Sequence, residues 1–328
     1  MIRILSIDGG GIRGVIPAML LAEIENRTNQ PIAHLFDLVA GTSTGAILAL
    51  GLTIPKQPCA PLNSAQQFVE MYEFEGPRIF ERSFWHRLTA FDNLHHPKYS
   101  TSGIEHVLHQ FFGDARLRDA ATNVLITSYE LERSFPFFFR SSNAREHPDY
   151  DFAARDVARA ASAAPTYFKP MKMLTGTVPD HYTLIDGGVF ANNPAACALV
   201  EARTSFPESG DFLVVSLGTG ELSLSLPYDQ TKNWGLARWA MPVLDVVFDG
   251  VSRTVDYQLR QLLPDAPGQC QRYYRFQTTL SACNHRIDNT CTANMAALKA
   301  LATNMVEERS EELDRLCDTL VTSRSRTE

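Results

Sequence analysis

The sequence predicts an α/β protein with a mostly parallel central sheet, and two observations near its start predict this class. Residues 2–7 alternate, are rich in β-branched side chains, and lead through a glycine loop into apolar residues at helical spacing. Residues 35–40 form a second apolar segment that turns sharply into residues 46–52, which are apolar on every side, as in a covered helix. Such a strand–helix–strand beginning implies parallel strands joined by a right-handed crossover.

The composition excludes several classes of protein. The 328 residues are 45% apolar and 20% charged, which supplies a large core and excludes a disordered chain. A formal net charge of −7 argues against binding nucleic acid or an anionic bilayer through the overall field. The first strand runs directly into glycines, which is unlike a signal peptide, and no apolar run reaches the roughly 18 residues of a membrane span.

The six cysteines are widely scattered, which favours a reduced, cytoplasmic compartment. A zinc site and ordinary thiols are the two interpretations of the local cluster formed by Cys270, Cys283, His285 and Cys291. Ordinary thiols are favoured because no C-x-x-C pair fixes the spacing of ligands, so we expect no metal.

Further elements follow along the chain. The pattern predicts strands at 124–129, 134–140, 182–185, 212–217 and 273–278, and helices at 153–164, 192–205, 233–263 and 292–320. Capping boxes at Ser64 and Ser102 predict two more helix starts. Phenylalanines in 134–140 are typical of a core, and residues 76–100 form either a lid over an apolar site or a loop packed on the body.

The sequence contains no internal repeat and no low-complexity linker, which favours a single domain. We expect a catalytic core at 1–222, a helical C-terminal portion of the same domain at 223–322, and a free tail at 323–328.

The most informative motif is Gly41-Thr-Ser-Thr-Gly45, a G-x-S-x-G nucleophile elbow that places Ser43 on a tight strand-to-helix turn. Glycines two positions before and after the serine let neighbouring backbone approach closely, and the helix N-terminus favours developing negative charge. The alternative is an ordinary small-residue turn, because the pattern alone is only moderately specific.

A second motif follows the first strand, at Asp8-Gly-Gly-Gly-Ile-Arg-Gly14. It satisfies the G-x-G-x-x-G dinucleotide fingerprint, which needs an acidic residue at the end of the second strand; Asp37 instead lies at the beginning of that strand. We therefore favour an oxyanion hole, in which the N–H groups of Gly9, Gly10 and Gly11, joined by that of Thr44, face an oxyanion next to Ser43.

A serine hydroxyl needs a base, and Asp186 is the better-placed candidate. It ends an apolar strand and is followed by Gly187 and Gly188, although a turn-forming aspartate would fit the same pattern. The one histidine after it, His285, follows no predicted strand. Because strands of a parallel sheet all end at one edge, we expect Asp8, Ser43 and Asp186 to gather in one crevice.

Taken together, these three motifs resemble the signature motifs of the patatin-like phospholipase family. The match covers roughly residues 1–220, and Ala160-Ala-Ser-Ala-Ala-Pro165 and Asn192-Asn-Pro194 also resemble sequences of that family. The resemblance implies a three-layer α/β/α fold with a Ser43–Asp186 dyad, an oxyanion hole at Gly9, Gly10 and Gly11 with Arg13 close by, and calcium-independent cleavage of lipid acyl esters without a cofactor. The remaining motif residues (Asp8, Gly14, Gly41, Gly45, Gly187 and Gly188) are expected to support these groups.

The resemblance implies a phospholipid substrate at a membrane surface, and we expect a cytoplasmic protein that associates with membranes peripherally during turnover. A nucleotide-binding protein and a catalytically inert lipid-binding module are the alternatives. Regulation by an activator and a role as a membrane-attacking effector, as in some bacterial members, stay open, as does the oligomeric state.

Overall fold

The computed structural model describes residues 1–57, 62–80, 97–176, 180–221, 226–239, 242–264, 271–280 and 286–322. One sheet forms the centre of the molecule, with the strand order β5-β6-β3-β2-β1-β7-β8 and with β4 also paired to β3. Its strands are β1 (Ile2–Ile7), β2 (Leu38–Gly41), β3 (Asn123–Glu130), β4 (Phe135–Arg140), β5 (Met171–Leu174), β6 (His181–Asp186), β7 (Phe212–Leu217) and β8 (Tyr273–Phe276).

The helices connect and cover these strands. They are α1 (Val15–Thr28), α2 (Ile32–Leu35), α3 (Thr44–Thr53), α4 (Ala65–Ile79), α6 (Thr101–Phe112), α7 (Ser141–Glu146), α8 (Ala154–Ala161), α9 (Gly188–Ala191), α10 (Ala195–Ser205), α11 (Tyr228–Thr231), α12 (Leu236–Trp239), α13 (Pro242–Leu262), α14 (Thr292–Glu308) and α15 (Ser310–Thr322). Short 3₁₀ turns occur at Gly11–Gly14, Leu117–Asp119 and Pro148–Tyr150.

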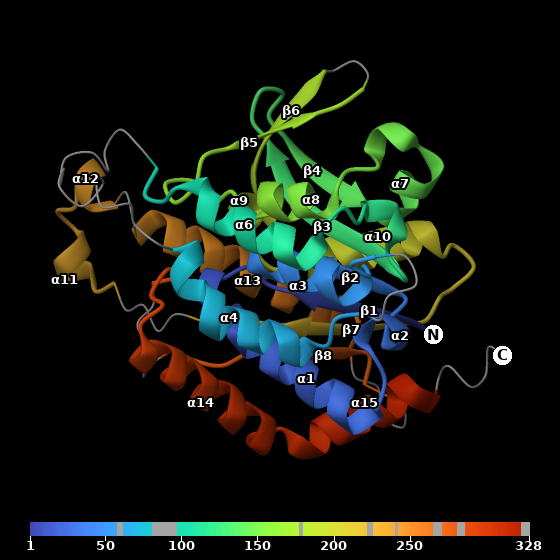
Figure 1. Cartoon of the computed structure of the whole chain (residues 1–328). Coiled ribbons are helices and arrows are strands. Elements are labelled where there is room, and N and C mark those ends of the chain that lie inside the picture. Colours follow the sequence, from blue (N-terminus) through green and yellow to red (C-terminus); the bar gives the residue numbers. More distant parts are fainter. Residues whose placement is uncertain are drawn as a thin grey trace.

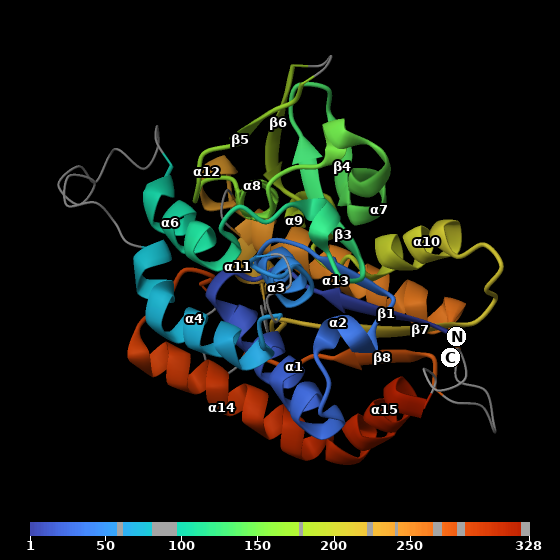
Figure 2. The same ribbon diagram turned by 45° about the vertical axis from the view of Figure 1, so that its right-hand side comes forward.

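Two hydrophobic cores lie on the two faces of the sheet, and β1 contributes to both. Leu5 and Ile7 pack into a core shared with α1, α3, α4, α14 and α15, whereas Ile4 packs with α10 and α13 on the opposite face. Successive side chains of a strand point to opposite faces, so a strand covered on both sides is apolar throughout. Figures 1 and 2 show these two groups of helices on opposite sides of β1 and β7, which confirms the predicted three-layer α/β/α fold.

The parallel and antiparallel parts of the sheet are separate. Strands β3, β2, β1, β7 and β8 pair in parallel, while β4 and β6 pair antiparallel with β3, and β5 pairs antiparallel with β6. The mostly parallel sheet was predicted from the sequence. The direction of β6 was not, and it matters for the site described below.

Several boundaries differ from the sequence-based expectations. The expected second strand at 35–40 begins later, because α2 ends at Leu35 and β2 runs from Leu38 to Gly41. Ser64 does form the predicted capping box, but the second helix is capped by Ser100 and not by Ser102. The expected helix at 292–320 is broken at Arg309 into α14 and α15, and 233–263 divides into α12 and α13.

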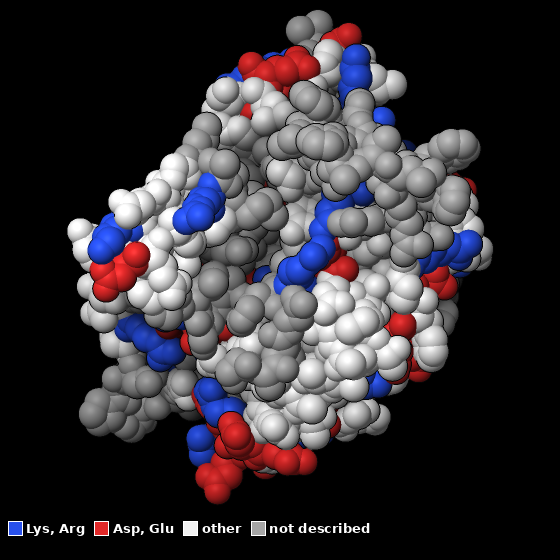
Figure 3. Space-filling view, turned by 90° about the vertical axis from the view of Figure 1, so that its left-hand side faces the viewer, with Lys and Arg blue, Asp and Glu red and all other residues white. Residues whose placement is uncertain are grey.

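The remaining expectations concern the phenylalanine-rich strand, the expected lid and tail, membrane-spanning helices and surface charge. Phe137 and Phe139 are buried, as a core role for 134–140 predicts. The aromatic residues and histidines of the expected lid (81–96), the tail (323–328), and Cys270, Cys283 and His285 lie outside the described residues. In the part of the chain that the structure describes, no helix has the length and apolar character needed to span a bilayer. Figure 3 shows a face on which the described basic and acidic side chains lie interspersed among uncharged ones.

Candidate active site

Ser43 lies at the corner between β2 and α3, in a strained backbone conformation. Its φ of 55° and ψ of −122° are rare for a residue other than glycine. The flanking glycines permit the turn, because a Cβ on Gly41 would lie 2.2 Å from the carbonyl oxygen of Gly45, and one on Gly45 would lie 2.2 Å from that of Ile7. The flanking glycines therefore allow a nucleophile elbow, which holds the half-buried Ser43 side chain at the N-terminus of α3.

Asp186 is the group that meets this serine. It lies at the end of β6, is only 4% exposed, and its carboxylate accepts a hydrogen bond from the N–H of Gly188 at 2.8 Å. Burial raises the pKa of Asp186 to about 6, against the lowering effect of a side-chain hydrogen bond from Ser43 and the bond from Gly188. Gly187 packs against Thr127 on β3, which fixes the end of β6 beside the elbow.

The expected meeting of Ser43 and Asp186 occurs, but for a different reason than the one given from the sequence. Because β6 is antiparallel to β3, the two residues do not end parallel strands at a common edge. Strand β3 pairs with β2 up to Ile126 opposite Gly41 and extends beyond it, so that Ser128 lies opposite Asp186. Strand β6 runs back along this extension and ends beside the elbow.

The glycine loop that follows β1 lies beside Ser43. The prediction that Gly9 offers a bare N–H group is wrong, because this N–H donates to the carbonyl of Asn192 at 3.0 Å. Among the described residues, no hydrogen bond uses the N–H groups of Gly10, Gly11 or Thr44. Three of the four expected donors therefore have no partner in the part of the chain that the structure describes.

A contact from the C-terminal part of the chain supports this loop. The N–H of Ile12 donates to the carbonyl oxygen of Ile287 at 2.9 Å. Gly11 has a φ of 59°, and a Cβ there would lie 2.3 Å from the same oxygen, so only glycine fits without a shift. The motif glycine thus serves the close approach of residue 287.

Asp8 does not face Ser43, although it begins the glycine loop. It is 1% exposed, and its carboxylate accepts two hydrogen bonds from Arg275 on β8, at 3.0 and 2.7 Å. It also accepts a hydrogen bond from the hydroxyl of Ser252 on α13 at 3.3 Å. Burial raises the pKa of Asp8, and Arg275 opposes this shift. Sequence reasoning missed Arg275, and the available signal was a single arginine within the otherwise apolar strand Tyr-Tyr-Arg-Phe.

Arg13 and Gly14 complete the first motif. The Nε of Arg13 donates to the carbonyl of Gly10 at 3.2 Å, and Gly14 lies against the side chains of Thr44 and Tyr72. The hydroxyls of Thr44 and Tyr72 are 2.5 Å apart, and burial raises the pKa of Tyr72, so this hydroxyl stays protonated. These contacts connect the glycine loop, the elbow helix and α4.

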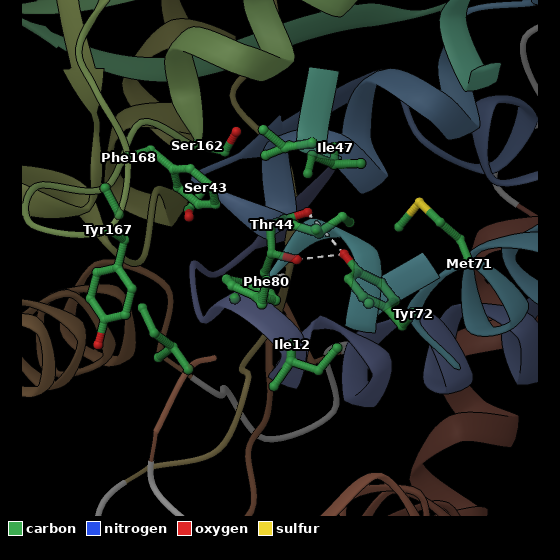
Figure 4. A pocket seen from close by; sticks show the side chains of 16 residues that line it. Ile12, Ser43, Thr44, Ile47, Met71, Tyr72, Phe80, Ser162, Tyr167 and Phe168 are labelled. Carbon is green, nitrogen blue, oxygen red and sulfur yellow. Dashed lines mark hydrogen bonds between the residues drawn. The ribbon is translucent and has the colours of Figure 1, made fainter. Parts of the chain in front are cut away.

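An apolar pocket opens next to Ser43. It contains about 530 Å³ of empty space, part of it open to solvent, and Figure 4 shows Ser43 at its wall among aliphatic and aromatic side chains. A second serine, Ser162, lines the pocket, but its hydroxyl donates to the carbonyl of Ala158 at 2.6 Å. The apolar lining residues include Ile12, Ile47, Met71, Ile79, Phe80, Ile104, Tyr167, Phe168 and Ile287.

A charged cluster holds Ile287 at the pocket. The buried carboxylate of Asp288 contacts the ammonium of Lys98, accepts a hydrogen bond from the Tyr99 hydroxyl at 2.6 Å, and accepts one from Arg286 at 3.1 Å. Burial acts to raise the pKa of Asp288, but the bonds from Arg286, Lys98 and Tyr99 outweigh it and lower that pKa. Asp288 therefore stays ionised and ties the segment before α6 to the turn around Ile287.

The remaining candidates take other roles. Asp37, the acid considered for a dinucleotide site, pairs with Arg3 at 2.8 Å and so fastens the starts of β1 and β2. Within the described ranges, no three His, Cys, Asp or Glu side chains come together as a metal site requires. His285 lies outside those ranges.

Comparison with known proteins gives three findings. A protein-family model described as patatin-like phospholipase matches residues 5–199, more than half of the chain. The chain is similar to the Solanum tuberosum protein named "Probable inactive patatin-3-Kuras 1", with 31% identity over 337 residues that cover 95% of this chain and 88% of that protein. It is also similar to Patatin-like protein 2 of Arabidopsis thaliana, with 34% identity over 291 residues that cover 79% of this chain and 71% of that protein.

A solved structure, VipD from Legionella pneumophila, is similar to this chain at a TM-score of 0.38 and 9% identity. The alignment covers 94% of this chain and 67% of VipD.

Proposed function

The chain belongs to the patatin-like phospholipase family, and we propose that it is a serine ester hydrolase that cleaves acyl esters of glycerophospholipids through Ser43 and Asp186. The observation that carries this proposal is the contact between the strained Ser43 and the buried Asp186, next to an apolar pocket. Phospholipase activity is a property of the family, and the dyad is our assignment for this chain.

The proposed reaction has two steps. The Ser43 oxygen attacks the ester carbonyl carbon while its proton moves to Asp186, and a tetrahedral oxyanion forms. When the bond to the alcohol breaks, Asp186 returns the proton to the departing alkoxide, and an acyl-serine ester remains. Water then attacks this ester, giving its proton to Asp186, and Ser43 recovers its proton as the fatty acid leaves.

Asp186 suits this role because of its burial. A carboxylate in water is too weak a base to accept a serine proton efficiently, and desolvation strengthens it. Its pKa of about 6 keeps it deprotonated at neutral pH and still brings it closer to the working pH. A lipid ester also expels an alkoxide, which can take the proton directly from the carboxyl group.

The oxyanion is proposed to bind the N–H groups of Gly10, Gly11 and Thr44. These three groups make no hydrogen bond among the described residues, and they lie on the loop and the helix start that flank Ser43. Preorganised backbone donors of this kind are worth about 10²- to 10³-fold in rate each. Gly9 is left out of the set because its N–H is taken by Asn192.

The apolar pocket is proposed to hold the acyl chain. Burial of a fatty chain against this apolar lining would be favourable, whereas burial of a polar peptide there would be unfavourable.

We propose no metal or other cofactor in the reaction, and therefore calcium independence. We also propose a cytoplasmic protein that meets membranes peripherally, with residues 1–222 as catalytic core and 223–322 as part of the same domain, since β8 pairs with β7.

A catalytically inert lipid-binding module is the second candidate, favoured by one observation, that the Solanum tuberosum relative is named as probably inactive. The presence of both Ser43 and Asp186 in contact favours the enzyme for this chain. A nucleotide-binding role is not favoured, because the second strand ends in the serine elbow.

The test is turnover of mixed phospholipid vesicles, in the presence of a calcium chelator, by the intact protein and by Ser43→Ala. We expect fatty acid release by the first and a loss of at least about 10³-fold in the second, with unchanged thermal unfolding. Equal turnover by both proteins would remove the assignment of Ser43, and absence of turnover on any ester would favour the inert module.

A further inference from the structure

Asp288 is a buried charged residue that lies outside the three sequence motifs. Its side chain is 1% exposed, and its carboxylate meets the ammonium of Lys98, the hydroxyl of Tyr99 and the guanidinium of Arg286. A carboxylate taken out of water needs such partners to offset its desolvation. The cluster therefore fixes the place of Asp288, and with it the place of its chain neighbour, Ile287.

On one side, the cluster is anchored in the wall of the apolar pocket. The N–H of Tyr99 donates to the carbonyl of Tyr167 at 3.0 Å. The Tyr99 ring packs edge-on against Phe80, with ring centres 5.5 Å apart, and its centre lies 5.9 Å from that of Phe168. Phe80, Tyr167 and Phe168 all line the pocket, as Figure 4 shows. The hydroxyl of Tyr99 thus ties Asp288 to a packed aromatic wall.

On the other side, the turn that contains Asp288 supports the glycine loop. The carbonyl oxygen of Ile287 accepts the N–H of Ile12 at 2.9 Å and lies where a Cβ on Gly11 would clash with it. Gly10 and Gly11 carry two of the three N–H groups that we propose for the oxyanion. Such donors must lie within about 2.7–3.1 Å of the oxyanion, so a small displacement of their backbone weakens them. A displacement of Ile287 would therefore reach the proposed donors.

Resting on the proposed hydrolase function, we propose that Asp288 is a positioning residue for the oxyanion-binding N–H groups of Gly10 and Gly11. Its carboxylate holds Ile287 at the glycine loop, and the carbonyl of Ile287 holds the backbone of Gly11 and Ile12. Asp288 thus acts through Ile287 and not by contact with the substrate. Because the oxyanion forms in the reaction and is absent from the bound ester, the residue acts on kcat and leaves KM nearly unchanged.

A role in stability alone is the alternative, since the loss of a buried ion pair destabilises any fold. Asp151 supplies a matched control. Its side chain is 2% exposed, and its carboxylate is paired with Arg116 at 2.6 Å and with Arg118 at 3.4 Å. None of these three residues is among the described residues that line the apolar pocket. Asp288→Asn and Asp151→Asn therefore both break a buried charge cluster, but only the first changes the support of the glycine loop.

The experiment combines kinetics with two ligands that share one alkyl chain. Hydrolysis of a medium-chain nitrophenyl ester gives kcat and KM, and thermal unfolding checks that each variant is folded. The first ligand is an alkyl trifluoromethyl ketone: the Ser43 oxygen adds to its carbonyl carbon, the serine proton moves to Asp186, and the carbonyl oxygen becomes an oxyanion. The second ligand is the alcohol made by reducing that ketone, which fills the same space but forms neither the covalent bond nor the oxyanion.

In Asp288→Asn we expect kcat to fall about 10- to 100-fold, KM to stay within about twofold, and the affinity for the ketone to fall by about the same factor as kcat. The affinity for the alcohol should stay within about twofold. Asp151→Asn should keep all four values within about twofold. Tyr99→Phe removes one hydrogen bond of the cluster and keeps the ring, so it should show the same pattern at about threefold. This variant decides the question should Asp288→Asn fail to fold.

An unchanged kcat in the variants of the cluster would overturn the proposal. Equal losses of affinity for the ketone and the alcohol would also overturn it, because they would indicate a change in the pocket wall alone. An equal loss of kcat in folded Asp151→Asn would do the same, because it would indicate a general effect of stability. Each of these results leaves the proposed hydrolase intact, since the original protein and Ser43→Ala are measured in the same series. If the original protein shows no turnover that depends on Ser43, the proposed function falls, and this inference falls with it.

Discussion

The first 220 residues and the last hundred meet at the glycine loop, and they contribute different things to it. The first part supplies Ser43, Asp186 and the N–H groups of Gly10 and Gly11, which have no hydrogen-bond partner among the described residues. The second part supplies Arg275, which pairs with the buried Asp8, and Ile287, whose carbonyl binds the loop. The groups that we propose to react come from the part with motifs, whereas the groups that hold them in place come from the part without motifs.

This difference has a physical cause. A reactive group on a tight turn needs particular neighbours in sequence, since glycines must allow the backbone to approach, and such requirements leave a local pattern. A supporting group needs only one suitable side chain at the right place in space. The following predictions test whether the two parts differ in this way, from the largest expected effect to the smallest.

Asp186→Asn should have the largest effect on the reaction. An amide cannot accept the serine proton, so we expect kcat to fall by about 10²- to 10⁴-fold, while the similar shape preserves the fold. Steady-state kinetics on a monoacyl ester, with thermal unfolding as the check on folding, measures this. Turnover within tenfold of the original protein would mean that a group other than Asp186 accepts the serine proton.

Arg275→Gln should act mainly on stability. Removing one partner of a buried ion pair leaves Asp8 uncompensated, for which we expect a loss of about 3–5 kcal/mol in the free energy of unfolding. Chemical denaturation measures it, and Arg275→Lys, which keeps the charge but not the paired hydrogen bonds, should lose less.

The double variant Asp8→Asn with Arg275→Gln should recover part of the stability lost by Arg275→Gln, because no buried charge is left unpaired. Strict additivity of the two single changes would show that Arg275 does not act through Asp8. A loss of activity in Arg275→Gln as large as that of Asp186→Asn, at full stability, would break the distinction between reacting and supporting parts.

The pH dependence of kcat/KM should follow the ionisation of Asp186 alone. With a pKa of about 6, the reactive carboxylate is lost as the pH falls, so kcat/KM should drop about tenfold per pH unit below 6 and be level above it. A profile that stays level down to pH 4.5 would contradict the buried base.

The ionisation of Asp186 should also have a smaller effect on the free energy of unfolding, which falls as the pH rises whereas activity increases. Its pKa is raised from 3.8 in the unfolded chain to about 6 in the fold, so the folded protein binds this proton more tightly. The stabilising contribution is complete below pH about 4 and is lost as the pH rises through 6. Asp186→Asn should remove this dependence, which unfolding measured at pH 4, 5, 6 and 7 in both proteins would show.

The sequence allowed prediction of the fold class, the elbow and the residues of the candidate dyad, because these depend on local patterns around Ser43 and Asp186. It did not allow prediction of the direction of β6, since a short strand has the same pattern whichever way it runs. The use of the Gly9 N–H by Asn192 was also hidden, because it depends on how two distant loops meet. The same holds for Arg275 and Ile287, whose partners lie more than 260 residues away in sequence.

The most direct test of the account is site-mapped labelling by a long-chain fluorophosphonate, followed by mass spectrometry of the digested protein. The account predicts a covalent adduct on the peptide that contains Ser43, formed at least about 10²-fold more slowly in Asp186→Asn and competed by phospholipid. An adduct on another residue, or equal labelling rates in the two proteins, would contradict it.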